Sequence, residues 1–394
     1  MISLQEATRL VIQQARFFGK EESLLDDAQG RVLSQTIVAD RDYPPFNRAT
    51  MDGIAIKSTD WEKGISSFTL AETIYAGAIA TQSIKSGECY KIMTGAGVPP
   101  SADTVIRKED IEENGKRLMI TVSEIAPGQN IAPKGADIQK GTAIIESPHL
   151  IKPGTINTLA SLGYSRVTVA QLPSVAIITT GDEVVNMDAP VSEVQIRNSN
   201  AALLKALLRQ WKIKPGSCGH IQDDSDTLLT AVKDQLRHDI LILSGAVSAG
   251  DADFVPEVLL KAGAKKIFHK VAIRPGKPIW FGQFDNGATV FALPGNPFST
   301  FVTFKLFIEK FLAECFGLPS AKTIHVPLSV NRIKKTNLDE FFPVVLSGNP
   351  TVATPLIFNT SGDITAVLHA DALALQAAEA VEIKEGHAIT CMVL

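Results

Sequence analysis

Residues 240–254 read ILILSGAVSAGDADF. The first four residues are aliphatic, and a short apolar run of this kind is typical of a strand buried on both faces of a parallel sheet. A loop with two glycines and two serines follows, and an apolar pattern with helical spacing begins at Phe254. Backbone N–H groups in such a loop, and at the start of the helix after it, can bind an anion such as phosphate. The stretch therefore predicts a strand, a ligand-binding loop and a helix.

The residues around this loop alternate between strand and helix patterns. Strand patterns occur at residues 175–178, 240–243, 267–273 and 289–293, and helix patterns at residues 201–211, 227–236, 254–262 and 298–316. This alternation predicts a mostly parallel sheet with helices on both faces. In such sheets, ligands bind at the carboxyl ends of the strands.

The rest of the chain has a different texture, and 394 residues are too many for a single core. A capping box at Ser3 and Glu6 predicts that the chain opens with an amphipathic helix. In the alternating region, Asn198-Ser199-Asn200 and Asp223-Asp224-Ser225 could cap the helices expected at residues 201–211 and 227–236. Short strand patterns separated by Gly, Pro and Asn predict β-rich modules before and after the alternating region. We expect a multidomain α/β plus β protein with four domains, namely residues 1–40 with 140–170 (elongated, helical and β), 41–139 (inserted, β-rich), 171–320 (α/β) and 321–394 (β-rich).

Composition excludes several classes of protein. The net charge is -4, without the basic block that nucleic acid or an anionic membrane surface would require. No apolar run approaches the length of about 20 residues that spans a bilayer, and no export signal is evident, so we expect a cytoplasmic protein. Four scattered cysteines, without a CxxC pair, indicate reduced, mostly packed thiols instead of zinc ligands or disulfides.

Acidic residues follow three of the strands in the alternating region. These residues are Glu183, Asp223, Asp251 and Asp253. Carboxylates in such places either cap helices or bind a cation, and carboxylates held close together repel each other unless something positive pairs with them. Mg²⁺ is the simplest partner, because it prefers oxygen ligands and commonly bridges carboxylates to a phosphate.

Basic residues also follow a strand of this region. Arg274 and Lys277 flank a Pro-Gly turn that ends at Pro278, and they either pair with surface acids or bind an oxyanion rigidly. Ser244, Gly245, Ser248, Asn296 and Ser299 complete the polar rim. Together these residues predict a site for a phosphorylated substrate and a divalent metal ion. Asp52 with Gly53, and Thr94, lie in two turns of the inserted region, where an Asp-Gly pair is ordinarily only a turn former.

Several of these motifs, in this order, resemble those of the molybdopterin molybdenumtransferases, the MoeA family, to which the E domain of gephyrin is related. The resemblance covers nearly the whole chain and rests on Pro45-Phe46 with Met51-Asp52-Gly53, Met93-Thr94-Gly95-Ala96, Gly135-Ala136-Asp137-Ile138, Thr180-Gly181-Asp182-Glu183, residues 244–253, Arg274-Pro275-Gly276-Lys277-Pro278 and Leu293-Pro294-Gly295-Asn296-Pro297.

This resemblance implies a molybdopterin-binding α/β domain, an inserted β-rich domain, an elongated N-terminal domain and a C-terminal β-barrel. It implies Mg²⁺-dependent insertion of molybdate into adenylylated molybdopterin, with release of AMP. It also implies a homodimer whose cleft lies between the α/β domain of one subunit and the inserted domain of the other. A molybdopterin adenylyltransferase would then be the upstream partner.

The resemblance also implies roles for individual residues. Asp52, Thr94, Glu183, Asp223 and Asp253 would be catalytic, and Asp223, Asp251 and Asp253 would bind the metal ion. The substrate-binding residues would be Asp137, Ser244, Gly245, Ser248, Lys270, Arg274, Lys277, Pro278, Asn296 and Ser299, of which Arg274, Lys277, Pro278 and Ser299 match the family's molybdate pocket.

Some residues depart from the family pattern. Ala132 and Leu338 stand where arginines are expected, Ala136 replaces a glutamate, and Arg274 replaces a lysine. The losses at residues 132 and 338 remove two cations that the resemblance leads us to expect. Two other functions therefore remain open: a non-catalytic scaffold that binds molybdopterin, and a Mg²⁺-dependent hydrolase of nucleotide pyrophosphates, which would not require molybdate. The choice between molybdate and tungstate also remains open.

Overall fold

The computed structural model describes residues 1–247, 254–319 and 322–394. These residues form two compact units. Unit 1 contains residues 1–35, 148–157 and 165–394, and unit 2 contains residues 36–147 and 158–164. Each unit has apolar clusters of its own, so the chain is a multidomain α/β and β-rich protein, as its sequence predicts. The finer division into four domains stays a prediction.

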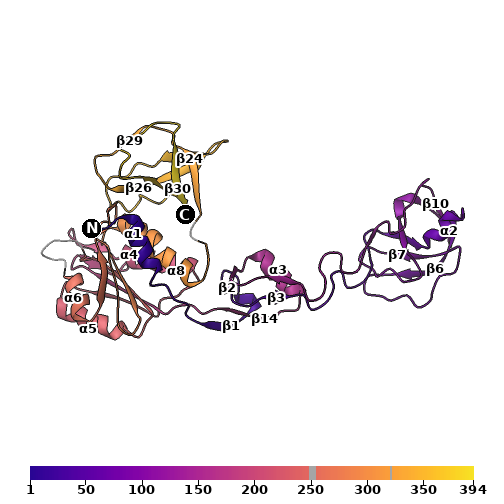
Figure 1. The fold of residues 1–394 in the computed structure, drawn as a ribbon, viewed down its shortest axis with the longest axis horizontal. Helices are drawn as coiled ribbons and strands as arrows, with labels where there is room; N and C mark the ends of the chain where they lie inside the picture. Colours follow the sequence, from indigo (N-terminus) through magenta and orange to yellow (C-terminus); the bar gives the residue numbers. More distant parts are fainter. Residues whose placement is uncertain (248–253, 320–321) are drawn as a thin grey trace. The chain divides into compact units, whose positions relative to one another are not determined.

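The central sheet of unit 1 has six strands in the order β18, β15, β19, β23, β22 and β20. Helices lie on both sides of this sheet (Figure 1). In the order given, the strands span Ser217–Ile221, Val175–Thr180, Ile240–Ser244, Thr289–Leu293, Trp280–Gln283 and Lys265–His269. The first four strands pair in parallel, whereas β22 and β20 extend one edge with antiparallel pairing. The prediction of a mostly parallel sheet is therefore confirmed.

Helices cover both faces of this sheet. Alternate residues of a strand point to opposite faces, and in residues 240–243 of β19 both sets are aliphatic, so each face is apolar and is covered by helices. Ile240 and Ile242 pack into one apolar core with α1 (Leu4–Ile12), α4 (Ser199–Gln210) and α8 (Glu309–Cys315). Leu241 and Leu243 pack into a second core with α5 (Ser225–Gln235) and α6 (Val255–Lys261). All five residues of β19 are buried, and each buried aliphatic side chain contributes roughly 1.5–3 kcal/mol to folding.

Three helices begin at the capping residues that the sequence predicts. Ser3 Oγ accepts a hydrogen bond from Glu6 N at 3.1 Å, Asn198 Oδ1 accepts one from Ala201 N at 3.1 Å, and Asp224 Oδ2 accepts one from Thr227 N at 2.8 Å. Each bond satisfies a backbone donor that has no partner within its helix. The caps fix where α1, α4 and α5 start.

The single strand expected at residues 267–273 is wrong. The structure has β20 (Lys265–His269) in the central sheet and β21 (Ile273–Arg274) in a different sheet. Lys270 adopts a left-handed conformation with φ of 70°, which turns the chain between the two strands. The sequence pattern also does not predict β22, the antiparallel partner of β20.

The long helix expected at residues 298–316 has three parts. Helix α7 (Pro297–Thr303) continues through a π-helical segment, η3 (Phe304–Ile308), into α8 (Glu309–Cys315). All five residues of η3 are buried, including Lys305, which pairs with Glu309. A π-helical insertion is frequent near functional sites, and this helix begins beside the cleft described below.

A second sheet of unit 1 contains β21 and the C-terminal strands in the order β21, β26, β28, β30 and β24, with β27 also paired to β26. The C-terminal strands span Thr323–Pro327 (β24), Asp339–Ser347 (β26), Val352–Pro355 (β27), Ala372–Gln376 (β28) and Ala388–Val393 (β30). Strands β25 (Arg332–Ile333) and β29 (Glu382–Ile383) form a separate pair. The parallel pairing of β21 with β26 connects the basic turn after Ile273 to the C-terminal β region.

The N-terminal part of unit 1 contributes a four-stranded sheet in the order β1, β14, β2 and β13. These strands span Lys20–Leu24, Arg166–Ala170, Val32–Leu33 and His149–Leu150, and helix α3 covers Pro153–Ser161. Within the described residues, every helix is too short or too polar to traverse a lipid bilayer.

Unit 2 is built on a six-stranded sheet in the order β8, β5, β7, β6, β10 and β9. In that order the strands span Thr104–Arg107, Gly53–Ile56, Glu88–Ile92, Ser67–Ile74, Arg117–Ile120 and Ile111–Asn114. The shorter elements of unit 2 are β3 (Ile37–Val38), β4 (Arg48–Ala49), α2 (Ser58–Glu62), β11 (Ile131–Ala132) and β12 (Ala143–Ile145). The β-rich character expected for residues 41–139 is confirmed.

Candidate active site

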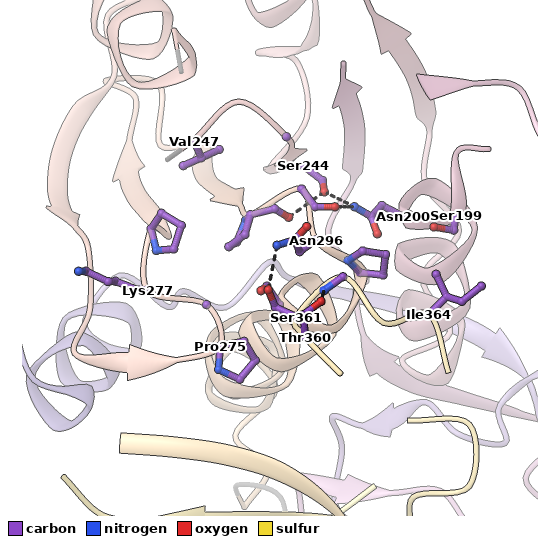
Figure 2. Close-up of a pocket in the computed structure, with 18 of the residues that line it drawn as sticks. Ser199, Asn200, Ser244, Val247, Pro275, Lys277, Asn296, Thr360, Ser361 and Ile364 are labelled. Atoms are coloured by element: carbon purple, nitrogen blue, oxygen red, sulfur yellow. Dashed lines mark hydrogen bonds between the residues drawn. The ribbon is translucent and has the colours of Figure 1, made fainter. Parts of the chain in front are cut away.

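A cleft of about 1430 Å³ lies within unit 1, at the carboxyl ends of the parallel strands. Its lining comes from the ends of β15, β19 and β23, from the turn after β21, and from two C-terminal segments, residues 332–341 and 358–364 (Figure 2). Nine of the predicted site residues line it: Glu183, Asp223, Ser244, Gly245, Arg274, Lys277, Pro278, Asn296 and Ser299. The sheet therefore brings together residues that are far apart in the sequence.

The hydroxyl of Ser244 connects three segments at the floor of the cleft through hydrogen bonds. This buried hydroxyl accepts a hydrogen bond from Asn200 Nδ2 at 3.0 Å and donates to the carbonyl of Pro294 at 3.3 Å. Asn200 Nδ2 also donates to the carbonyl of Gly295 at 2.6 Å. These contacts fix the end of β19 against the start of α4 and the loop after β23 (Figure 2).

Two polar atoms of the cleft have no hydrogen-bond partner among the described residues. They are Oγ1 of Thr180 and Oδ1 of Asn200, and both are buried. A buried polar atom without a partner costs free energy, so such atoms are candidate contacts for a ligand. Asn200 and Thr180 are thus candidate binding residues, although the sequence indicates Asn200 only as a helix cap.

Gly245 can only be a glycine in this arrangement. Its φ is +115°, and a Cβ atom would lie 2.5 Å from Oγ1 and 2.7 Å from the carbonyl oxygen of Thr180. A side chain would therefore meet both a backbone that L-residues rarely adopt and a fixed neighbouring strand. This close approach lets the backbone at Gly245 lie directly against Thr180, the last residue of β15.

The acidic side of the cleft lies at the ends of β15 and β18. Burial raises the pKa of Asp223, and the neighbouring carboxylates of Asp182 and Glu183 raise it further, whereas a hydrogen bond from the Asp182 backbone and the charge of His220 lower it. Asp182 Oδ1 separately accepts a hydrogen bond from Asp223 N at 3.0 Å. Burial and the like charges outweigh the positive charge nearby. The donor set here, made of carboxylate oxygens, suits a hard cation such as Mg²⁺.

The predicted metal ligands are only partly described. Asp251 and Asp253 lie outside the described residues, as does the predicted substrate-binding residue Ser248. In the described part of the chain, no group of three or more His, Cys, Asp or Glu residues has the geometry of a metal site. Asp223 is therefore the one described member of the predicted ligand set.

The basic side of the cleft is the turn between Arg274 and Pro278. Gly276 in this turn has φ of +104°, and a Cβ there would lie 2.6 Å from Thr303 Cγ2, so the turn packs closely on α7. Arg274 Nη1 lies 3.6 Å from Glu340 Oε1, whereas Lys277 forms no ion pair with any described residue. The turn thus presents positive charge to the cleft, and of its two basic residues Arg274 alone has an acidic group within 4 Å among the residues that the structure describes.

Residues of the C-terminal region also line the cleft, and of these the sequence singles out Leu338 alone, which stands where an arginine is expected. Ser361 Oγ accepts a hydrogen bond from Asn296 Nδ2 at 2.8 Å (Figure 2). Lys335 is exposed and lines the cleft without an ion pair to any described residue. Its neighbour Lys334 is buried and donates to the carbonyls of Leu338 and Ala377. Apart from Leu338, the only sequence signal for this wall is the Lys-Lys pair, which is not specific.

Three predicted residues lie in unit 2. Asp52 Oδ1 accepts hydrogen bonds from Thr94 N at 2.7 Å and Thr94 Oγ1 at 2.8 Å. These two bonds, the one from Thr94 N first, hold the pKa of Asp52 below its usual value, with a smaller contribution from Lys108. Asp137 is exposed, and its backbone N–H donates to Tyr43 O at 2.9 Å. Asp52 and Thr94, which the sequence places in two separate turns, are therefore in direct contact.

Lys270 lies outside the cleft, and the cysteines are mostly packed, as the sequence predicts. Lys270 is in unit 1 but does not line the cleft; its carbonyl accepts a hydrogen bond from Ile2 N at 3.2 Å. The cysteines are unpaired: Cys89, Cys315 and Cys391 are buried, and Cys218 is exposed. Burial raises the pKa of Cys89 and Cys315 to about 12 and that of Cys391 to about 11. These three thiols are not reactive nucleophiles.

Known proteins with this architecture belong to molybdenum cofactor synthesis. Residues 2–163 match the model of the MoeA N-terminal region (domain I and II), and residues 176–314 match that of a probable molybdopterin binding domain. A molybdopterin molybdenumtransferase of Synechocystis is 33% identical over 94% of each chain. One from Staphylococcus aureus is 31% identical over 98% of this chain and 94% of its own length.

Solved structures give the same result. The molybdopterin biosynthesis MoeA protein of Pyrococcus horikoshii OT3 superposes with a TM-score of 0.86 at 26% identity, over the whole of both chains. A molybdenum cofactor biosynthesis protein of Pyrococcus furiosus has a TM-score of 0.63 at 18% identity, also over both whole chains, and it shows the fold alone.

Proposed function

Because this chain belongs to the MoeA family of molybdopterin molybdenumtransferases, we propose that it inserts molybdenum from molybdate into adenylylated molybdopterin, in a Mg²⁺-dependent step that releases AMP. Molybdenum cofactor biosynthesis is the function that its relatives establish for it, as a transferase. The observation that best supports the finer statement is the cleft itself, in which unpaired carboxylates stand opposite a rigid basic turn. A substrate with a phosphate group, a metal ion and an oxyanion matches this division of charge.

The residues of the cleft would act by binding and by neutralising charge. The bond that breaks joins AMP to the molybdopterin phosphate, and positive charge close to the phosphate oxygens stabilises the leaving group as negative charge develops. Arg274 and Lys277 would bind the oxyanion, and Ser244, Asn200 and the Gly245 loop would orient the substrate. No Cys lines the cleft among the described residues, and we expect no covalent intermediate on the protein.

Mg²⁺ would be held by Asp223 together with Asp251 and Asp253, and would neutralise charge on the phosphate. The raised pKa of Asp223 supports this assignment, because a bound cation would remove the repulsion from Asp182 and Glu183. Glu183 lines the cleft beside Asp223 and would position the metal-bound substrate. Asp137, Ser248, Asn296, Ser299 and Pro278 would contribute further substrate contacts.

We also propose that the active form is a homodimer, in which Asp52 and Thr94 of one subunit complete the cleft of the other. The support is chemical: Asp52 is an ionised carboxylate held by Thr94, with no basic side chain bonded to it among the described residues. The same proposal includes four domains, with the C-terminal strands closed into a β-barrel. It also includes a cytoplasmic location and a molybdopterin adenylyltransferase as the upstream partner.

The test is AMP release from adenylylated molybdopterin by the purified protein, with and without molybdate and Mg²⁺. We expect release only with both, and a loss of about 100-fold or more in Asp253→Ala and Asp223→Ala. Asp234→Ala is the matched control, because Asp234 is exposed on α5 and does not line the cleft.

Each other outcome points to a different function. Tight binding of the substrate without AMP release would indicate a scaffold. AMP release that does not depend on molybdate would indicate a hydrolase of nucleotide pyrophosphates. Either result would contradict the proposed transfer.

A further inference from the structure

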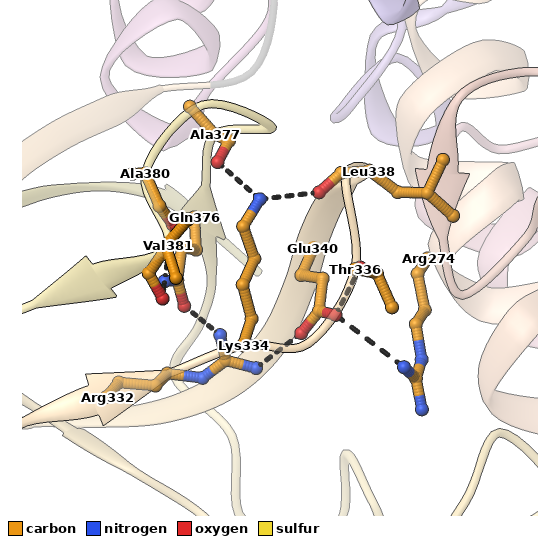
Figure 3. Close-up of polar contacts among 10 residues, drawn as sticks. All are labelled: Arg274, Arg332, Lys334, Thr336, Leu338, Glu340, Gln376, Ala377, Ala380 and Val381. Atoms are coloured by element: carbon orange, nitrogen blue, oxygen red, sulfur yellow. Dashed lines mark hydrogen bonds and ion pairs between the residues drawn. The ribbon is translucent and has the colours of Figure 1, made fainter.

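A carboxylate with little exposure to solvent lies between the basic turn and the C-terminal sheet. Glu340, on β26, lines the cleft, and its side chain is only 10% exposed. Its Oε2 accepts a hydrogen bond from Arg332 Nη2 at 3.0 Å, and its Oε1 accepts one from Thr336 Oγ1 at 2.7 Å. The third neighbour, Arg274 Nη1, lies 3.6 Å from the same Oε1 (Figure 3).

Arg332 and Thr336 hold this carboxylate in place. Arg332 donates its other Nη to Gln376 and lies 4.0 Å from the ring centroid of Phe342. Gln376 is fully buried and donates in turn to the carbonyls of Ala380 and Val381. Each link in this chain is a hydrogen bond between groups with little freedom to move, so Glu340 is a fixed charge.

The segment that carries Thr336 is also anchored. Lys334 donates to the carbonyls of Leu338 and Ala377, which closes the loop between β25 and β26 (Figure 3). The strand β26 then pairs in parallel with β21, with Arg274 opposite Glu340 in the register. The backbone therefore sets the distance between the carboxylate and the basic turn.

Arg274 differs from the other two partners of Glu340. Its side chain is 62% exposed, and its separation of 3.6 Å from Glu340 is too long for a hydrogen bond. Arg274 forms no other side-chain hydrogen bond or ion pair with a described residue. A guanidinium group has five N–H donors, and here Glu340 attracts the group without using them. The donors remain available to a ligand in the cleft.

We propose that Glu340 is a positioning residue, which orients the guanidinium of Arg274 for a tetrahedral oxyanion in the cleft. The ligand class is a dianion such as molybdate or a phosphate group, and this assignment rests on the proposed function. A planar fork binds such an anion through two parallel hydrogen bonds only when it is correctly oriented. A fixed neighbouring charge lowers the entropy that Arg274 would otherwise lose on binding.

The charges at this corner agree with that role. Glu340 is one negative charge beside two arginines, and Lys277 adds a third cation, so these four described side chains together carry a net positive charge. Burial alone would raise the pKa of Glu340, but hydrogen bonds from Thr336 and Arg332 and the charges of both arginines lower it overall. Glu340 is thus ionised at neutral pH and continues to attract the guanidinium of Arg274.

The experiment is a double-mutant cycle on the full chain with Glu340→Gln and Arg274→Ala. Calorimetry measures the Kd of inorganic molybdate and of inorganic phosphate, and AMP release gives KM for molybdate and kcat. We expect Glu340→Gln to weaken oxyanion binding and raise KM by roughly 5- to 10-fold, with kcat changed less than about twofold. In the Arg274→Ala background, the same substitution should change neither value.

Two further variants make the result specific. Glu382→Gln is the matched control, because Glu382 is exposed on β29 and lies outside the cleft lining. Thr336→Val removes one hydrogen bond to Glu340 and retains its charge, so it tests the inference if Glu340→Gln does not fold. We expect Thr336→Val to raise KM by about twofold in the natural background and not at all with Arg274→Ala.

Three results would overturn the inference. If Glu340→Gln weakened oxyanion binding equally in the natural and Arg274→Ala backgrounds, the role of Glu340 would be purely structural. Tighter oxyanion binding in Glu340→Gln would show that the carboxylate competes for Arg274. Failure of the unsubstituted protein to bind either oxyanion would exclude an anion seat. A protein that binds oxyanions through the coupled pair but releases no AMP would contradict only the proposed function, and the two Kd values separate a molybdate seat from a phosphate seat.

Discussion

Two of the sheets that carry or adjoin predicted site residues use glycine in different ways. In the central sheet of unit 1, Gly245 follows β19 and needs both a left-handed backbone and free space beside Thr180. In unit 2, Gly53 starts β5 and needs only space, since a Cβ there would lie 1.7 Å from the carbonyl oxygen of Ile106 on β8. The first glycine lets the end of β19 lie close to Thr180 beside the cleft, whereas the second allows two strands to pair beside Asp52.

This difference separates a complete pocket from a local contact. Around Gly245, side chains from several elements converge on one cleft. Around Gly53, Asp52 contacts Thr94 across two turns of a single sheet and remains partly exposed. Substitution of Gly245 in unit 1 should therefore change both the stability of the fold and substrate binding. In unit 2, substitutions at Gly53 and at Thr94 should affect these two properties separately.

The largest expected effect is that of Gly53→Ala. The clash with backbone of β8 cannot be relieved by a side-chain movement, so we expect a loss of about 3–5 kcal/mol in the stability of unit 2. Peptide-resolved hydrogen exchange should show faster exchange in β5 and β8. Gly64→Ala is the control, because it has positive φ but no atom within 4 Å, and it should cost about 1–2 kcal/mol. Equal effects of the two substitutions would contradict the close approach.

Gly245→Ala should be the next in size. The positive φ and the contact with Thr180 predict a loss of about 2–3 kcal/mol, measured by thermal unfolding, together with loss of AMP release. Gly219→Ala, in the edge strand β18 of the same sheet, has open space around its Cβ position and should change stability by less than about 0.5 kcal/mol. A folded, fully active Gly245→Ala protein would show that the loop tolerates a side chain.

Asp223→Asn should stabilise the protein slightly near pH 7. A raised pKa means that the fold disfavours the ionised carboxylate, so the cost is present above the folded-state pKa and disappears as the pH falls through it. After solvent screening we expect less than about 0.5 kcal/mol, or a rise in Tm of about 1–2 °C. Mg²⁺ should stabilise the natural protein and not the variant. Asp234→Asn should leave the Tm and its response to Mg²⁺ unchanged, and a lower Tm in Asp223→Asn would refute this account.

The smallest expected effect is that of Thr94→Val, which should be visible only in a titration. It removes the hydroxyl hydrogen bond to Asp52 and keeps the one from the backbone, so the pKa of Asp52 should rise but stay below its usual value. The stability from this lowered pKa is present above the unfolded-state pKa and is lost as the pH falls through the folded-state value. Carboxyl NMR measures the shift, with Thr69→Val, an exposed change on β6, as the control. An unchanged pKa would assign the effect to the backbone alone.

Sequence pattern was sufficient wherever the local signal and the tertiary structure agree. The aliphatic run at residues 240–243 predicts a strand buried on both faces, and the capping residues Ser3, Asn198 and Asp224 predict the starts of three helices. Because parallel strands end at the same edge of a sheet, the pattern also predicts that the residues after them meet. Nine predicted residues do line one cleft.

The remaining features depend on contacts between distant segments. The turn at Lys270 has no local signal, since a lysine in a left-handed conformation is imposed by the pairing on either side of it. Lys335, Glu340 and Ser361 reach the cleft only because β26 pairs with β21 and the segment after it folds back. The sequence pattern of residues 321–394 does not predict that these three side chains line the cleft.

The pairing of β21 with β26 also limits how this protein could be recombined. The basic turn and the sheet that carries Glu340 share a backbone ladder, so a chimaera joined near residue 320 would combine a turn and a sheet that had not been selected for each other's register. Exchange of segments between relatives should therefore preserve activity only when residues 273–278 and 332–341 are inherited from the same parent. The boundary near residue 320 looks like the simplest junction in the sequence, but it separates two segments whose strands pair in the fold.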